Sequence, residues 1–235
     1  MIKIMKYGQV PASEIFDRGT AADDVSGIVR DIIKDVSENG DTALKKYCAK
    51  FDGFDQLMPL EVSDDEWALA MEAVDKDLIS VMEKAAANIR AFHSRQVRNS
   101  FVISETDGIV MGQKVVPLDK VGLYVPGGTA SYPSSVLMNA IPAKIAGVKE
   151  IVMVTPSRGG SINPVILAAA KVAGIDRVFK IGGAQAVAAL AYGTATVPRV
   201  DKIVGPGNAF VAEAKKQVFG MVAIDMIAGP SEILV

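Results

Sequence analysis

The chain has 235 residues, of which 50% are apolar and 22% are charged, a composition typical of globular proteins. Its formal net charge of −2 disfavours a nucleic-acid partner, which would require a strongly basic face. No uncharged apolar run reaches the ~18 residues of a membrane span, and the first residues lack the apolar stretch of a signal peptide. The single cysteine, Cys48, excludes a disulfide framework within the chain. We therefore expect a cytoplasmic protein that binds neither membranes nor nucleic acid.

Apolar periodicity predicts a helical region at the start of the chain. One helical face collects the apolar residues Val25, Ile28, Val29, Ile32, Ile33 and Val36. Asn39-Gly40 predicts the end of this helix, and Asp41 the cap of a second, shorter helix that runs to Lys50. The pattern Ser63-x-x-Glu66 is that of a capping box and predicts the start of a third helix.

A longer helix and a hairpin are expected to follow. The packing face of the helix is expected to comprise Leu78, Val81, Met82, Ala85, Ile89 and Phe92. Two β-rich runs, 101–104 and 112–116, flank the turn-like Asp107-Gly108 and predict a hairpin. We expect residues 1–114 to form a helical N-terminal region that ends with this hairpin.

From residue 115 onward the pattern changes to short apolar runs that alternate with helical segments. The expected strands are Val121–Val125, Ile151–Thr155, Arg177–Ile181, Lys202–Val204 and Ala223–Met226. Strands separated by helices in this way pair in parallel through right-handed crossovers. The expected fold class is α/β: an N-terminal helical region followed by an incomplete Rossmann-like parallel sheet, residues 115–235, with helices on both faces.

Glycine-rich turns follow four of these strands. They are Pro126-Gly127-Gly128, Gly182-Gly183, Gly205-Pro206-Gly207 and Gly229-Pro230. Carboxyl ends of parallel strands share one edge of the sheet, where backbone N–H groups at helix starts suit a pyrophosphate. Any one of these turns could equally serve a tight connection without a ligand. Because Phe210 stands where the usual dinucleotide fingerprint has Gly or Ala, the residues indicate an atypical nucleotide-binding domain.

Four motifs resemble the histidinol dehydrogenase family, in the same order along the chain. They are Val121-Gly122-Leu123-Tyr124-Val125-Pro126-Gly127-Gly128, Gly182-Gly183-Ala184-Gln185-Ala186, Asp201-Lys202-Ile203-Val204-Gly205-Pro206-Gly207-Asn208 and Ile224-Asp225-Met226-Ile227-Ala228-Gly229-Pro230-Ser231-Glu232. A looser similarity extends through the helical region, including residues 40–44 and 91–93, so that essentially the whole chain is covered.

The resemblance implies an enzyme of histidine biosynthesis. That family oxidises L-histidinol through histidinal to L-histidine with NAD, depends on zinc, forms homodimers and is similar in architecture to the aldehyde dehydrogenase superfamily. By resemblance, Tyr124, Gln185 and Asn208 match NAD-binding positions, and Ser231 lies in the motif that reaches towards the substrate. From the residues alone, Tyr124 could be an ordinary strand aromatic, and Asn208 and Ser231 could be caps.

The chemistry of the family requires residues that this chain lacks. Family members continue for roughly as long again, and that half contains their acid/base residues and zinc ligands. We therefore expect no catalytic residue and no metal ligand here, only the cofactor-binding half, inactive alone. His93 and Cys48 are expected to be structural.

Two alternatives to this reading stay open. One is a related zinc-dependent polyol dehydrogenase, such as a sulfopropanediol dehydrogenase. The other is a noncatalytic nucleotide-binding or assembly module. NAD and NADP are not distinguished by the sequence.

Overall fold

The computed structural model describes residues 4–15, 24–127 and 132–227. Its helices are α1 (Ala12–Ile15), α2 (Ser26–Asp52), α3 (Asp64–Ala73), α4 (Lys76–His93), α5 (Pro133–Ile145), α6 (Pro164–Ala173), α7 (Gly183–Tyr192) and α8 (Ala209–Val218), with a 3-10 turn at Ser94–Gln96. Its strands are β1 (Phe101–Ile103), β2 (Met111–Gln113), β3 (Lys120–Tyr124), β4 (Glu150–Val154), β5 (Arg177–Phe179), β6 (Lys202–Val204) and β7 (Ala223–Ile224).

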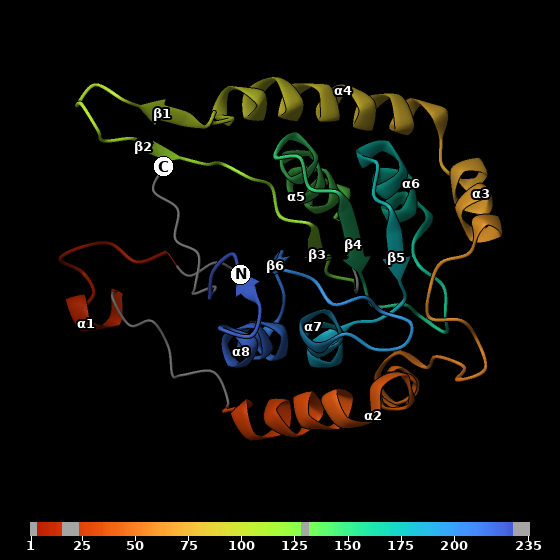
Figure 1. Cartoon of the computed structure of the whole chain (residues 1–235). Helices are drawn as coiled ribbons and strands as arrows, with labels where there is room; N and C mark the ends of the chain where they lie inside the picture. Colours follow the sequence, from red (N-terminus) through yellow and green to blue (C-terminus); the bar gives the residue numbers. More distant parts are fainter. Residues whose placement is uncertain (1–3, 16–23, 128–131, 228–235) are drawn as a thin grey trace.

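The larger sheet is parallel, with the strand order β5-β4-β3-β6-β7. The chain builds β3, β4 and β5 outward in one direction, then crosses back over the sheet to place β6 and β7 on the other side of β3. Helices α5 and α6 cover one face, and α7 and α8 cover the other (Figure 1). The expected α/β class with helices on both faces is therefore confirmed, and the strand order reverses between β3 and β6.

Both faces of the sheet are buried, which explains why its strands are continuous apolar runs. In β4, Ile151 and Met153 belong to the core on the side of α5 and α6, whereas Val152 and Val154 belong to the core on the side of α7. In β3, a Cβ atom at Gly122 would lie 2.8 Å from Cδ1 of Leu190. Glycine at this position therefore allows α7 to pack closely against the central strand.

The N-terminal helices form a second layer outside the α/β core, on both of its faces. Helix α2 packs against α7 and α8, while α3 and α4 pack against α5 and α6 (Figure 1). The N-terminal helices therefore lie on opposite sides of the α/β core. This arrangement brings the end of α2 to the carboxyl edge of the sheet.

Helix α2 consists of two helical stretches that meet where the sequence predicts a break. Gly40 is a kink with a φ of 52° and a ψ of −129°, and the second stretch continues to Asp52, close to the predicted end at Lys50. Asp41 was expected to cap a separate helix, but its carboxylate accepts hydrogen bonds from the backbone N–H and the hydroxyl of Thr196. Asp41 therefore ties α2 to the loop after α7. The helix ends at Gly53, whose φ of 64° is the left-handed conformation common at helix ends.

The predicted capping box of α3 is confirmed. Glu66 N–H donates to Ser63 Oγ at 3.3 Å, and Ser63 N–H donates to Glu66 Oε2 at 2.9 Å. The same Glu66 carboxylate accepts two hydrogen bonds of 3.0 Å from Lys180, which is 1% exposed and follows β5. One carboxylate thus caps α3 and neutralises a buried cation.

The predicted packing face of α4 is only partly correct. Met82 is buried, and Ala85 and Ile89 pack against the core, but Val81 and Phe92 are exposed by 61% and 65%. The face that packs on the core is rotated from the predicted one, towards Ile79 and Ala86 and away from Val81 and Phe92.

The predicted hairpin is confirmed, with β1 and β2 paired antiparallel. All six residues of the two strands are exposed, although most of them are apolar. The hairpin therefore extends from the body of the molecule as an apolar arm (Figure 1). Among the described residues, none of the helices combines the length and the apolar character that a bilayer crossing requires.

Candidate functional site

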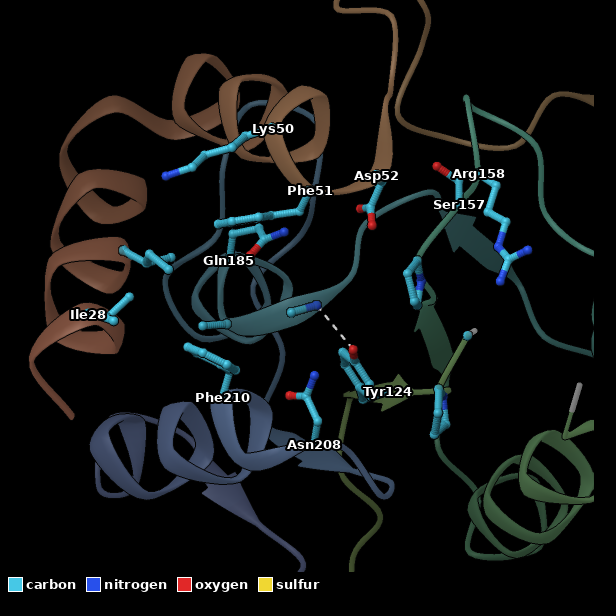
Figure 2. Close-up of a pocket in the computed structure, with 16 residues that line it drawn as sticks. Ile28, Lys50, Phe51, Asp52, Tyr124, Ser157, Arg158, Gln185, Asn208 and Phe210 are labelled. Carbon is cyan, nitrogen blue, oxygen red and sulfur yellow. Dashed lines mark hydrogen bonds between the residues drawn. The ribbon is translucent and has the colours of Figure 1, made fainter. Parts of the chain in front are cut away.

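A cavity of ≈ 710 Å³ lies at the carboxyl edge of the sheet. Its walls come from α2 and from the segments that follow β3, β4, β5 and β6 (Figure 2). The strand order reverses between β3 and β6, and ligands of open α/β sheets bind outside the strand ends at such a switch point. The volume lies within the ~300–1,000 Å³ of small-molecule sites. Tyr124, Gln185 and Asn208 all line this cavity.

Tyr124 ends the central strand β3 and is 4% exposed. Its hydroxyl oxygen accepts a hydrogen bond of 3.0 Å from the backbone N–H of Gly183, the first residue of α7 (Figure 2). Burial raises the pKa of the Tyr124 hydroxyl above its usual value, so it stays protonated at neutral pH. Because the oxygen accepts from Gly183, the O–H proton remains available for a ligand.

Gln185 lies in the first turn of α7 and is 2% exposed. Its side chain lies across the helix start, so that a Cβ atom at Gly183 would be 2.7 Å from Gln185 Oε1, and Gly183 also has a φ of +65°. Glycine at 183 therefore makes room for this amide. The structure gives the amide no hydrogen-bond partner among the described residues, and the residue faces the cavity.

Asn208 serves as the cap of α8 and also lines the cavity. Its Oδ1 accepts a hydrogen bond of 3.1 Å from the backbone N–H of Val211. The two interpretations of Asn208 are therefore compatible, because the cap uses the oxygen and leaves the NH₂ group on the cavity side (Figure 2). Phe210, the residue that breaks the usual fingerprint, lines the same wall.

The loop after β6 is fixed by two charged residues that the sequence did not single out. Gly205 N–H donates to Asp225 at 2.9 Å, and Lys215 Nζ donates to the Gly205 carbonyl at 2.9 Å and forms an ion pair with Asp225. Burial alone would raise the pKa of Asp225, but hydrogen bonds from Lys215 and two backbone N–H groups outweigh burial and lower it. Gly205 has a φ of +116°, and a Cβ there would lie 2.1 Å from the carbonyl oxygen of Tyr124.

Four further polar residues of the cavity, Lys50, Asp52, Ser157 and Arg158, were missed by the sequence analysis. Asp52 is the last residue of α2, and Ser157 lies in the loop after β4. In the loop after β4, Thr155-Pro156-Ser157 comes first and the glycine pair Gly159-Gly160 only afterwards, so no glycine-rich turn was predicted directly after this strand. Asp52 reaches the cavity only because α2 folds over the sheet, which no local pattern shows.

The remaining candidates lie elsewhere. Ser231 falls outside the described residues. Cys48 is buried in the core, where burial raises the pKa of its thiol to about 12, and His93 Nδ1 lies 2.7 Å from Gln96 Oε1 at the end of α4. Neither lines the cavity. Within residues 4–15, 24–127 and 132–227, no three His, Cys, Asp or Glu residues form a group that could hold a metal ion.

A doubly wound parallel sheet with a cavity at its switch point defines an α/β protein of the Rossmann-like class. A family model described as histidinol dehydrogenase matches residues 17–235. The chain belongs to this family.

Known proteins similar to this chain are about twice its length. Histidinol dehydrogenase from Clostridium acetobutylicum is 53% identical over 241 aligned residues, which cover 100% of this chain and 56% of that protein. The Pseudomonas fluorescens Pf0-1 enzyme is 59% identical over 215 residues, 91% of this chain and 49% of that protein. A crystal structure of histidinol dehydrogenase from Elizabethkingia anophelis matches with a TM-score of 0.87 and 41% identity, over 94% of this chain and 52% of that chain. The chain therefore spans about half the length of the relatives it matches.

Proposed function

We propose that this chain provides the NAD-binding part of an L-histidinol dehydrogenase, an oxidoreductase of histidine biosynthesis that converts L-histidinol through histidinal to L-histidine. The observation that carries the proposal is the convergence of Tyr124, Gln185 and Asn208 on one cavity. These residues end or follow three different strands, and family membership adds the reaction. By the same resemblance, we propose a homodimer that works in the cytoplasm.

The residues present fit a dinucleotide. Bound NAD would supply the hydride acceptor of the reaction. The first turn of α7 offers the backbone N–H groups of Ala184 and Gln185 to a phosphate oxygen, since neither donates to a described residue. The Gln185 amide and the Asn208 NH₂ group offer further donors, and the Tyr124 hydroxyl adds an O–H proton.

The described residues do not fit a zinc site, and we assign no step to this metal. They also place no histidine at the cavity that could accept the proton of the substrate alcohol. The role of this part of the molecule in the proposed reaction is to bind and orient the cofactor. Ser231 is proposed to contact the substrate, on the resemblance of its motif to the family.

The proposal is tested by titrating NAD into the 235-residue chain and following binding by ligand-observed NMR. We expect weak binding, with a dissociation constant of roughly 1 mM, because an open cavity desolvates little of the ligand. Gln185→Ala removes an amide that the fold does not use, so affinity falls about 5- to 30-fold. Gln113→Ala, at an exposed position of β2, is the matched control. Equal binding by wild type and Gln185→Ala, with both folded, would remove Gln185 from the site.

A turnover assay tests whether this part of the molecule binds the cofactor without catalysing the reaction. With L-histidinol, NAD and added zinc, we expect the chain alone to form no NADH, because the described residues place no histidine at the cavity and form no group that could hold zinc. Formation of NADH above a protein-free control would contradict this assignment.

A further inference from the structure

Lys215 is a buried cation in α8 that packing alone does not explain. The residue is 3% exposed. Its Nζ donates a hydrogen bond of 2.9 Å to the carbonyl oxygen of Gly205 and forms an ion pair with Asp225, which follows the edge strand β7. Burial of an ammonium group costs free energy, and an apolar side chain of similar size would fill the same space without that cost.

Lys215 and Asp225 together hold both polar groups of Gly205. The backbone N–H of Gly205 donates to Asp225 Oδ2 at 2.9 Å, and the Gly205 carbonyl oxygen accepts from Lys215. Asp225 is itself held by the sheet, because its backbone N–H donates to the Ile203 carbonyl of β6 at 3.2 Å. The conformation of Gly205 is therefore set by one partner from α8 and one from the end of β7.

Gly205 requires such a restraint because little else fixes its backbone. It has no side chain, and its φ of +116° lies in a region that side chains rarely allow. Pro206 has no N–H, so the peptide group between these residues offers only the Gly205 carbonyl for a hydrogen bond. Gly205 also lies against the carbonyl oxygen of Tyr124, where an added Cβ would collide. A rotation at Gly205 would therefore change how the loop after β6 lies on β3.

The orientation of Gly205 determines where the chain reaches Asn208. Pro206 fixes its own φ, and Gly207 packs so closely on α8 that a Cβ there would collide with Cγ1 of Val211. Asn208 then begins the helix, with Oδ1 bound to the Val211 N–H and its NH₂ group on the cavity side (Figure 2). The restraint on Gly205 is thus passed along a short, stiff segment to the amide that faces the cavity.

We propose that Lys215 and Asp225 are positioning residues of the cofactor site, which hold the peptide groups of Gly205 and thereby place the Asn208 NH₂ group for the dinucleotide. The inference rests on the proposed function. Neither charged side chain lines the cavity, so both act through the backbone of the loop and not by contact with the ligand. A purely structural pair would change stability alone, whereas a positioning pair also sets the affinity of the folded protein for NAD.

The test measures NAD affinity by ligand-observed NMR, and the free energy of unfolding in urea, for variants of the 235-residue chain. Lys215→Met removes the donor to the Gly205 carbonyl and should weaken NAD binding about fivefold, the effect of one hydrogen bond. Lys215→Met/Asp225→Asn leaves no charge unpaired, so it should be at least as stable as Lys215→Met. Its NAD binding should stay about fivefold weaker, because the Gly205 carbonyl still lacks its donor. Lys216→Met is the matched control, since this neighbouring side chain is 58% exposed, and it should bind NAD as wild type does.

A double-mutant cycle with Asn208 tests the route of the effect. Asn208→Ser removes the NH₂ group but keeps an oxygen that caps a helix, and it should also weaken NAD binding about fivefold. Because Lys215 acts by placing this amide, Asn208→Ser/Lys215→Met should lose no more than about fivefold in total. Independent effects of the two changes would instead multiply to about 25-fold.

The outcomes separate the inference from the proposed function. Wild-type affinity in folded Lys215→Met or Lys215→Met/Asp225→Asn, or losses that multiply in the cycle, would overturn the inference while dinucleotide binding by wild type stands. A folded wild type that binds no NAD would refute the proposed function, and the inference with it. A fivefold loss that persists in Lys215→Met/Asp225→Asn and does not grow in the cycle supports the positioning role.

Discussion

Replacing Asp52 with Asn should stabilise the free protein, and the gain should depend on pH. The carboxyl pKa is raised from 3.8 to about 6 by burial. A raised carboxyl pKa means that the folded state holds its proton more tightly than the unfolded state. Ionisation therefore favours unfolding, so stability falls as pH rises from about 4 to about 6, and the full loss persists above that range.

The size of the effect follows from the pKa shift. About two pKa units correspond to about 3 kcal/mol, at ~1.4 kcal/mol per unit. Asp52 is partly exposed, and solvent screens its charge, so we expect about 1–2 kcal/mol. Other titrating groups contribute alike to wild type and variant and cancel in the difference.

Urea denaturation of both proteins between about pH 4 and pH 8 measures this difference. We expect Asp52→Asn to gain about 1–2 kcal/mol relative to wild type across this range, with most of the change between about pH 4 and pH 6. Asp31→Asn, at an exposed position of the same helix, serves as the control for net charge. A stability difference between Asp52→Asn and wild type that is independent of pH would refute the reasoning.

Three other predictions concern stability and self-association. Gly205 has a φ of +116°, and a Cβ there would collide with the carbonyl oxygen of Tyr124. Gly205→Ala should therefore lower the free energy of unfolding by at least about 3 kcal/mol. Gly108 also has a positive φ, but a Cβ there would meet open space, so Gly108→Ala should lower the free energy of unfolding by only about 1 kcal/mol. Similar melting temperatures for Gly205→Ala and Gly108→Ala would contradict the close approach of Gly205 to the Tyr124 carbonyl. Glu66→Gln leaves the buried Lys180 charge unpaired and should lower the free energy of unfolding by about 3 kcal/mol. Lys180→Met removes the buried charge itself and should lower it by about 1 kcal/mol or less. A larger loss for Lys180→Met than for Glu66→Gln in urea denaturation would refute this reasoning. Val110→Lys on the apolar hairpin, at a position 73% exposed, should reduce self-association in sedimentation velocity, and unchanged association would exclude this surface.

The sheet and part of its cavity could be predicted because parallel strands obey simple rules. Apolar runs that alternate with helices specify a parallel sheet, and its strand ends must meet at one edge. Tyr124, Gln185 and Asn208 each follow or end a strand, so their convergence follows from the topology.

The contribution of α2 to the cavity could not be predicted in this way. Asp52 lies beside Ser157 only because a helix from the start of the chain packs over the sheet, and this contact has no local signal. The orientation of α4 was missed for a similar reason. In each case tertiary packing decides between local conformations or helix faces that the sequence leaves nearly equivalent.

The position of α2 also has a consequence for the order of folding. This helix is synthesised before the strands, but its main partners, α7 and α8, come near the end of the described chain. The hydrogen bonds between Asp41 and Thr196 join residues 155 positions apart. At roughly 5–20 residues per second, the ribosome needs on the order of 10–30 s to span that distance. During this interval the apolar face of α2 has no native surface to cover it, so this face becomes buried only after α7 and α8 have been synthesised.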